Sequence, residues 1–308
     1  MLGRMFGPKK KQAGKQGGKR DATREIPTIP VAPPPVKPPA ASDAQKKSVA
    51  LPQLVVGCAQ SVGMQRDHNE DAILTLTTLS ATNNDGYLPL GLFIIADGMG
   101  GHKHGEIASN LAVHTIAHHI MSKVMLPLLA STPTSPGDPI QEILENSVQE
   151  AHRMISKEAP GSGTTLTVIL ISGEQMSIAH VGDSRAYAVD LDGAMQVLTR
   201  DHSLVMRMLE LGHLTEQEAS VHPQRNVLYR ALGQGEPFTP DISTSPLPNA
   251  GYLLLCTDGL WGVVPQTEMS RIIKTASTPD SACQQLIDAA NKAGGPDNIS
   301  AILVRIPD

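Results

Sequence analysis

Two short apolar runs in this chain end in the same pair of residues, an aspartate followed by a glycine. Residues 92–96, LFIIA, stop at Asp97, and residues 252–257, YLLLCT, stop at Asp258. Each run is too short for a helix and has the length of a buried strand. An Asp-Gly pair after a strand is ordinarily only a turn. Its repetition, however, favours a fold in which carboxylates stand at the ends of two buried strands.

The chain is long enough to bury one large core or two small ones. It has 308 residues, of which 40% are hydrophobic. No apolar run approaches the roughly 18 residues of a membrane-spanning helix. The N-terminus, MLGRMFGPKKKQ, lacks the apolar segment of a secretory signal. We therefore expect a cytoplasmic protein.

The first fifty residues differ in composition from everything after them. They hold eleven Lys or Arg, three Asp or Glu and eight prolines. This indicates a disordered, basic, Pro-rich extension over residues 1–50, which is either a tether or a segment that binds an acidic or proline-recognising partner. Residues 51–308, the expected folded domain, carry fourteen basic and twenty-seven acidic residues, a formal charge of −13. So acidic a domain is not expected to bind nucleic acid.

Three cysteines, Cys58, Cys256 and Cys283, lie in or beside apolar segments and form no Cys-x-x-Cys pair. Their placement predicts reduced, buried thiols rather than disulfides or a zinc site.

Grouped runs of strand and helix character predict an α+β fold. Strands are expected at residues 54–60, 72–79, 92–96, 164–172, 175–181, 185–190, 194–199, 238–245, 252–257 and 299–306. Helices are expected at residues 105–130, 140–155, 203–220, 265–276 and 279–292. Because strands and helices do not alternate regularly, we expect two antiparallel sheets packed face to face with helices outside, a four-layer α-β-β-α sandwich.

Turn chemistry adds detail to this expected fold. Residues 80–90 are expected to form a polar loop, and residues 221–237 a surface loop or flap. The four strands between residues 164 and 199 have the pattern of one meander of antiparallel hairpins. The final strand, residues 299–306, is expected at a sheet edge.

Acidic residues occupy turns that adjoin the apolar strands: Glu70 and Asp71, Asp97, Asp258 and Asp297. Strand ends of one sandwich can converge at one rim, where crowded carboxylates repel one another unless a cation neutralises them. Oxygen ligands without a matching His or Cys set favour Mg²⁺ or Mn²⁺ over Zn²⁺. So many carboxylates suit two ions, about 3.5–4 Å apart, which would activate water for attack on phosphorus.

Seven motifs follow one another along the chain: GMQRDHNED from Gly63, ADGMGGH from Ala96, SGTTL from Ser162, VGDSR from Val181, HPQRN from His222 with RALG from Arg230, CTDGL from Cys256 and GPDN from Gly295. In order and approximate spacing they resemble the metal-dependent serine/threonine protein phosphatases of the PPM family (type 2C), and in particular its compact bacterial branch. The resemblance covers roughly residues 53–306.

The resemblance implies roles for the acids and their glycine. Asp97 matches the ligand that bridges two metal ions, and Gly98 matches the residue that donates its backbone carbonyl. Asp258 and Asp297 match the remaining direct ligands of the second ion.

Three residues of the first motif also acquire roles. Glu70 and Asp71 match the acids that hold metal-bound water or reach the metals directly. Arg66 matches the arginine that clamps the substrate phosphate, for which a planar fork of donors is well suited. Arg66, Asp97 and Asp258 are thus the expected catalytic residues.

A weaker third metal site is also implied. Asp183 matches the acid that forms it together with Asp258, although beside Arg185 it could equally be a hairpin-turn or salt-bridge residue. Asn226 lies where bacterial relatives place a flap residue near the third ion.

Met99 follows Asp97-Gly98 where eukaryotic-type members have a histidine proposed as the general acid. The bacterial branch commonly has methionine there. Protonation of the leaving group then falls to metal-bound water, unless His102 or His104 reaches the site.

Three further histidines, His114, His118 and His119, have a spacing that resembles a helical metal cluster. We interpret them as ordinary helix residues, because the last two are adjacent and point to different faces.

The resulting expectation is a hydrolase that removes phosphate from phosphoserine or phosphothreonine with two or three Mn²⁺ or Mg²⁺ ions and no covalent intermediate. Its expected partners are phosphorylated proteins, including a serine/threonine kinase. One alternative is a catalytically silent phosphoprotein-binding or sensor module on the same fold, which the filled ligand positions argue against. A phosphatase for small metabolites is a second alternative.

Overall fold

The structure, a computed structural model, describes residues 53–82, 86–100, 104–130, 134–235, 238–248 and 250–307. The chain divides into two units, Met1–Ser48 and Val49–Asp308. The extension predicted for residues 1–50 lies outside the described residues, so its character stays a prediction.

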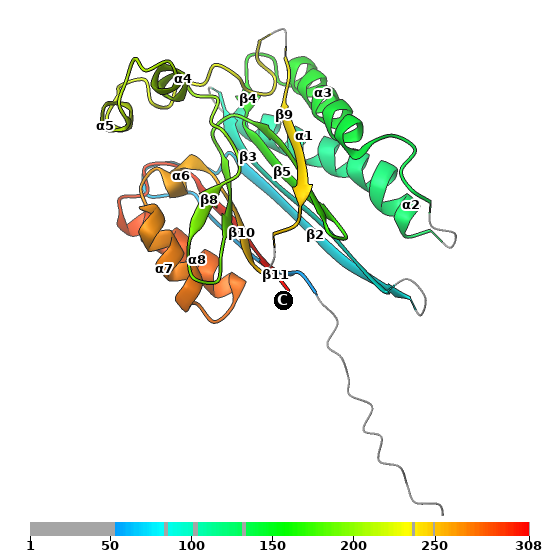
Figure 1. Cartoon of the computed structure of the whole chain (residues 1–308). Helices are drawn as coiled ribbons and strands as arrows, with labels where there is room; N and C mark the ends of the chain where they lie inside the picture. The colour runs from blue at the N-terminus through cyan, green and yellow to red at the C-terminus, as the bar shows by residue number, and fades with distance from the viewer. Residues whose placement is uncertain are drawn as a thin grey trace, which may run out of the picture. The chain divides into compact units, whose positions relative to one another are not determined.

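Two antiparallel sheets form the centre of the described fold (Figure 1). The five-stranded sheet has, in spatial order, β1 (Val55–Ser61), β11 (Ile299–Ile306), β10 (Gly251–Cys256), β7 (Arg185–Val189) and β8 (Met195–Val197). The other has β2 (Asp71–Thr82), β3 (Gly86–Met99), β5 (Leu166–Ser172), β6 (Gln175–Val181) and β9 (Asp241–Pro246), with the short β4 (Gly163–Thr164) paired to β3.

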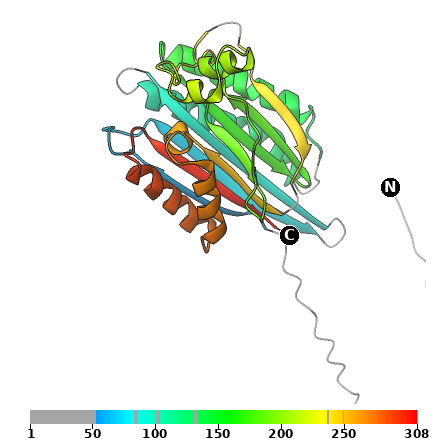
Figure 2. The ribbon, with the colours of Figure 1, turned by 60° about the vertical axis from the view of Figure 1, so that its left-hand side comes forward.

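Helices cover the outer face of each sheet (Figure 1). The sheet of β2 and β3 carries α1 (His104–Ile120), which continues through a π-helical turn, η1 (Met121–Met125), into α2 (Leu126–Leu128), and α3 (Ile140–Glu158). Beside the other sheet lie α6 (Asp258–Trp261), α7 (Gln266–Thr275) and α8 (Pro279–Lys292). Two short helices, α4 (Leu204–Glu210) and α5 (Glu216–Ser220), lie together at one end, outside these layers (Figure 2). The expected α+β sandwich with outer helices is confirmed.

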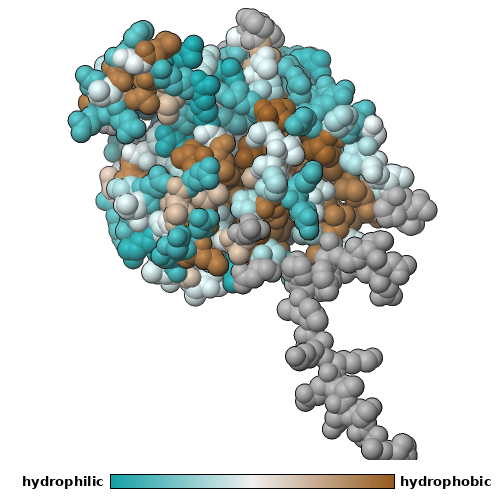
Figure 3. Space-filling model, in the orientation of Figure 1, coloured by the Kyte–Doolittle hydropathy of each residue, from teal (hydrophilic) through white to brown (hydrophobic). Residues whose placement is uncertain are grey.

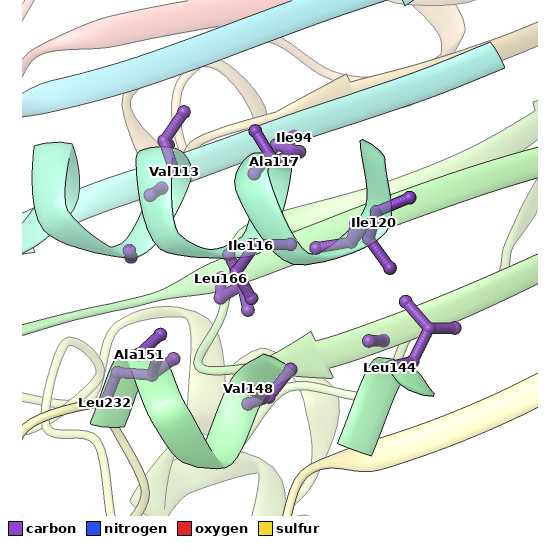
Figure 4. Close-up of a cluster of buried hydrophobic side chains, with 14 of the residues drawn as sticks. Ile94, Val113, Ile116, Ala117, Ile120, Leu144, Val148, Ala151, Leu166 and Leu232 are labelled. Carbon is purple, nitrogen blue, oxygen red and sulfur yellow. The ribbon is translucent and has the colours of Figure 1, made fainter. Parts of the chain in front are cut away.

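The two apolar runs are continuous because each strand is buried on both faces. On β3, Ile94 packs under α1 (Figure 4), whereas its neighbour Ile95 packs between the sheets. On β10, Leu254 packs under α7 and α8, and Leu255 packs between the sheets. Since side chains alternate along a strand, a strand between two cores has no solvent-facing position. Each such burial stabilises the fold by about 1.5–3 kcal/mol.

The loop expected at residues 80–90 is wrong for most of its length. Ser80 pairs with Leu88, and Thr82 pairs with Gly86, so β2 and β3 form a long hairpin. Residues 83–85 lie outside the described residues. Pairing with a neighbouring strand outweighed the polar composition on which the loop was predicted.

The expected meander is also wrong, because it crosses from one sheet to the other. β5 and β6 pair in one sheet, and β7 and β8 pair in the other. Between them, Gly182 has φ of 101°, and a Cβ atom there would lie 2.7 Å from Cβ of Thr165. Gly182 thus permits a close crossing that a residue with a side chain would obstruct.

The last strand is central rather than an edge. β11 lies between β1 and β10 and pairs antiparallel with both. The sequence pattern reported its burial, but burial alone does not identify neighbours. Sequence reasoning also missed α6, the single helical turn that begins at Asp258.

Cys256 and Cys283 are buried and free, as expected, whereas Cys58 is free but exposed, so that part of the prediction is wrong. Within the described part of the chain, no helix has the length and apolar character needed to cross a membrane.

Candidate metal and phosphate site

A cavity of about 260 Å³ lies where the ends of strands from both sheets meet. It is lined by every site residue predicted from the sequence except Asp71, and also by the predicted flap residue: Arg66, Glu70, Asp97, Gly98, Asp183, Asp258, Asp297 and Asn226. The topology therefore brings together residues that are separated by up to 231 positions, Arg66 and Asp297. Met99 lies in the same wall.

Asp97 is held in place by the end of β3. Its backbone N–H donates to Oγ1 of Thr165 (2.9 Å), and its carbonyl accepts from the Thr165 N–H (2.9 Å) and from Oγ1 of Thr164 (2.9 Å). All polar backbone groups of the residue are thus used, which leaves the carboxylate free to face the cavity. Burial, reinforced by Asp71 and other nearby acids, raises the pKa of Asp97 well above its ordinary value.

Asp71 lies behind Asp97, directly across the β2–β3 pairing. Its Oδ2 accepts hydrogen bonds from Oγ of Ser300 (2.6 Å) and Oγ1 of Thr257 (3.1 Å), but its buried Oδ1 has no hydrogen-bond partner. Burial and the nearby charge of Asp258 raise the pKa of Asp71 to about 7. Two hydroxyls thus fix one carboxylate oxygen of Asp71 and leave the other without a hydrogen-bond partner.

Asp258 begins α6 and lines the same cavity as Asp97. Burial, together with the charge of Asp297, raises the pKa of Asp258 to about 6. The neighbouring Gly259 allows the start of α6 to pack closely against Asn298, since a Cβ there would lie 2.0 Å from the carbonyl oxygen of Asn298.

Glu70 is anchored through its backbone. Its carbonyl accepts from the Gly98 N–H (3.1 Å) and from Oγ of Ser109 (2.6 Å). Its Oε1 is buried without a hydrogen bond, 3.5 Å from Nε2 of His68. A Cβ at Gly98 would lie 2.2 Å from the carbonyl oxygen of Gly105, so glycine at position 98 is a packing requirement.

Arg66 and Asp297 form an ion pair at the cavity mouth, with Nη2 and Oδ2 2.7 Å apart. The arginine side chain is 48% exposed and the aspartate 28%. An exposed pair contributes little to stability, so the guanidinium can exchange this partner for another anion at low cost.

Asp183 lies in the crossing between β6 and β7. It is neither the hairpin-turn residue nor the salt-bridge partner of Arg185 that the sequence left open. It is not in a hairpin turn, because β6 and β7 belong to different sheets. The guanidinium of Arg185 instead pairs with Asp201 (2.8 Å) and lies 3.6 Å over the ring of Trp261. Burial and the charge of Asp258 raise the pKa of Asp183 well above its ordinary value.

Asn298 is a structural member of the site that the sequence reasoning passed over. Its Nδ2 donates to the carbonyls of Val62 and His68 (both 2.9 Å), and its Oδ1 accepts from the Glu70 N–H (2.8 Å). It therefore positions the segment that carries Arg66 and Glu70. The GPDN motif contains the signal, but Asn298 had been given no role in it.

The described histidines that were considered as proton donors or ligands do not line this cavity. His102 lies outside the described residues. His104 is exposed at the start of α1, and it is not among the residues that line the cavity. His114 and His118 are exposed on the same helix, and His119 is half-buried.

The donor set fits a hard divalent cation. Three buried carboxylate oxygens among the described residues lack any hydrogen-bond partner: Oε1 of Glu70, Oδ1 of Asp71 and Oδ1 of Asp258. Burying an oxygen without a hydrogen-bond partner costs folding free energy. Carboxylate oxygens are also the ligands that Mg²⁺ and Mn²⁺ prefer. Among the described residues, no group of three or more His, Cys, Asp or Glu side chains is arranged so that it could hold a metal ion as it stands. Acids that repel one another without a cation between them are expected to stand apart in this way.

Metal affinity is expected to fall as the pH is lowered. The raised pKa values of about 7 for Asp71 and about 6 for Asp258 mean that each acid binds a proton below that pH. A cation must then displace the protons, which costs about tenfold in affinity per pH unit for each one. Calorimetric titration with Mn²⁺ at pH 5.5 and pH 8, in two buffers of different ionisation enthalpy, should show weaker binding and proton release at the lower pH. Equal affinity without proton release would contradict the assignment.

Comparison with known proteins places this geometry among phosphatases. Residues 57–299 match the family protein phosphatase 2C. The serine/threonine phosphatase stp of Listeria innocua is 35% identical over 248 residues, covering 79% of this chain and 92% of that protein. Protein phosphatase PhpP of Streptococcus pneumoniae is 35% identical over 243 residues, covering 76% and 96%.

Solved structures agree with these sequence relatives. The Mycobacterium tuberculosis serine/threonine phosphatase PstP/Ppp superposes with a TM-score of 0.68 at 29% identity, covering 83% of this chain and 99% of that one. The catalytic domain of PstP in complex with two manganese ions has a TM-score of 0.66 at 28% identity, with the same coverage.

Proposed function

The chain belongs to the protein phosphatase 2C family, a family of serine/threonine phosphatases that use Mn²⁺ or Mg²⁺, and we propose which of its residues perform that reaction. The observation that carries the proposal is the convergence of Asp97, Asp258 and Asp297, from distant parts of the chain, on one cavity together with Arg66. Its acids suit divalent cations, and its guanidinium suits a phosphate dianion.

We assign the metal ligands to the acids that face or flank this cavity. They are Glu70, Asp71, Asp97, the carbonyl of Gly98, Asp183, Asp258 and Asp297. The unpartnered oxygens of Glu70, Asp71 and Asp258 support this set. When bound, such ions neutralise the acids and lower the pKa of water, so that water can attack phosphorus at neutral pH.

Arg66 is the proposed phosphate-binding residue. Its ion pair with Asp297 holds the guanidinium at the cavity mouth, and a bidentate contact with phosphate would replace that pair. Met99 has no titratable group, so the leaving serine or threonine oxygen takes its proton from water. Asn226, which lines the same cavity, can donate or accept a hydrogen bond with that water or with phosphate.

A polypeptide substrate is favoured over a small metabolite by a second, larger cavity of about 750 Å³ that shares Arg66, Asn226 and Asp258 with the first. Its walls include apolar Met206 and Trp261. The protruding part of the surface formed by α4 and α5 presents apolar and polar residues side by side (Figure 3). The larger cavity has room for the residues that flank a phosphorylated side chain in a polypeptide.

Hydrolysis should require a divalent cation. With Mn²⁺ we expect turnover of p-nitrophenyl phosphate and of a phosphothreonine peptide, and with EDTA we expect none, because the repelling acids then bind no cation. Phosphate release measures both. If the protein binds the phosphopeptide but releases no phosphate in Mn²⁺, it is the catalytically silent sensor module instead. If it hydrolyses only small phosphorylated metabolites, the proposed protein substrate is wrong.

Three sequence-based predictions complete the proposal. They are a cytoplasmic location, a serine/threonine kinase among the substrates, and a binding partner for the basic Pro-rich residues 1–50.

A further inference from the structure

Two buried histidines lie behind the crossing that carries Asp183, and the reaction described above uses neither. His180 is 2% exposed and His202 is 1% exposed. Their ring centroids are 5.1 Å apart. Neither ring lines the cavity of the metal and phosphate site, so any contribution to the reaction must pass through the residues they contact.

His202 holds Gly182, the residue before Asp183, from two sides. The Gly182 N–H donates to Nδ1 of His202 (3.1 Å), and the backbone N–H of His202 donates to the Gly182 carbonyl (2.7 Å). Because a backbone N–H can only donate, Nδ1 must be the unprotonated ring nitrogen. The ring proton therefore lies on Nε2.

The other nitrogen of His202 points to an acid on β9. Its Nε2 lies 3.2 Å from Oδ2 of Asp241. The Asp241 carboxylate also accepts a hydrogen bond from Nη1 of Arg230 (2.7 Å). The same Nη1 lies 3.2 Å from Nε2 of His202. Asp241 thus fixes the ring tautomer, as carboxylates do for metal-binding histidines. Burial lowers the pKa of His202 and so favours the neutral ring that this geometry requires.

These contacts connect Asp183 to the segment that carries Asn226. The Tyr229 N–H donates to the carbonyl of His202 (2.9 Å), so residues 229 and 230 both bond to the His202–Asp241 pair. On the far side of the crossing, Nε1 of Trp261 donates to the carbonyl of Asp183 (2.9 Å). The peptide groups on both sides of the Asp183 Cα are therefore held.

We propose that His202 is a positioning residue of the phosphatase site: by accepting the Gly182 N–H while donating to Asp241, it aims the Asp183 carboxylate and couples it to the segment of Asn226. The inference rests on the proposed role of Asp183 as a ligand of the weakest ion. It predicts that a change at His202 alters that ion's affinity without touching the Arg66 end of the site.

Two amide variants separate the two nitrogens of the ring. In His202→Asn the amide oxygen can take the place of Nδ1 and accept the Gly182 N–H. In His202→Gln the amide reaches the place of Nε2 and can donate to Asp241, but the Gly182 N–H loses its acceptor. Asp183→Asn in the full chain is the reference for loss of the weakest site.

The measurements are calorimetric Mn²⁺ titration, kcat and KM with p-nitrophenyl phosphate, and the NMR shift of the Gly182 amide. We expect His202→Gln to weaken the weakest Mn²⁺ site about tenfold, to lower kcat with KM unchanged and to shift the Gly182 amide. His202→Asn should stay within about threefold of the unaltered protein on each readout. A purely structural role would lower the melting temperature of both variants without separating their Mn²⁺ affinities, and that result would overturn the proposal.

Asp241→Ala keeps the test decisive if the buried variants do not fold, since the Asp241 side chain is 47% exposed. It should weaken the same Mn²⁺ site in the same direction, by about threefold, whereas unchanged Mn²⁺ binding would refute the coupling. Failure of the proposed phosphatase function can be told apart from failure of the His202 proposal, because in the first case the unaltered protein lacks Mn²⁺-dependent turnover altogether.

Discussion

Replacing Asp97 with asparagine or alanine should abolish hydrolysis of a phosphothreonine peptide in Mn²⁺, with a loss in kcat of about a thousandfold or more. Asp97 lies at the junction of the acids, facing the cavity beside Asp258 and across the strand pairing from Asp71. If Asp97 is a metal ligand as proposed, removing its carboxylate would remove an oxygen donor that the ions need. Phosphate release under saturating Mn²⁺ measures the effect, and retained turnover would refute the ligand assignment.

The same substitution should stabilise the protein when metal is absent. Burial and neighbouring acids raise the pKa of Asp97 above its unfolded value, so ionisation of this group costs folding free energy as the pH rises through the folded pKa. In EDTA at pH 8, Asp97→Asn should therefore have a higher melting temperature than the unaltered protein. A lower melting temperature would instead indicate that lost activity reflects misfolding.

Arg66→Ala is the matched contrast at the other end of the cavity. The arginine contacts Asp297 but offers no oxygen to a cation, so its loss should raise KM about tenfold or more while calorimetric Mn²⁺ binding is retained. Arg66→Lys should recover only part of the effect, because an ammonium lacks the planar fork. Unchanged KM for a small phosphoester would contradict the phosphate-binding role.

Gly98→Ala should damage both the fold and the site. The added Cβ would lie 2.2 Å from the carbonyl oxygen of Gly105 and 2.6 Å from that of Glu70. Both obstacles are backbone atoms, so β3, the start of α1 or the Glu70 segment must move. We expect a loss of about 3 kcal/mol in the free energy of unfolding, measured by urea denaturation, together with loss of Mn²⁺-dependent turnover.

Gly137→Ala is the control, because nothing lies within 4 Å of a Cβ at that position. The alanine there should leave stability unchanged or raise it by about 0.4–1 kcal/mol, since it restricts the unfolded chain. If Gly98→Ala were as harmless as Gly137→Ala, the close approach of β3 to α1 would not be essential.

Local patterns in the sequence were sufficient for the elements with uninterrupted periodicity. The last strand runs over Ile299–Ile306 and α8 over Pro279–Lys292, both as expected, because apolar spacing directly reports which faces are buried. Asp97 and Asp258 were identifiable for the same reason. An acid that abruptly ends an apolar run marks the end of a buried strand, and its repetition at Asp97 and Asp258 indicated a shared site.

The partners of each element were decided only by the tertiary structure. Periodicity reports which residues are buried but not which strands lie beside them, so β11 was expected at an edge although β1 pairs with it on its outer side. Asp183 could not be told from a hairpin residue by sequence, because only the structure shows that the chain crosses between the sheets at Gly182. Asn298 and His202 act through hydrogen bonds to Glu70, 228 positions away, and to Gly182, 20 positions away. By itself the sequence therefore determined which acids end the strands, and the packing of two sheets determined which residues aim them.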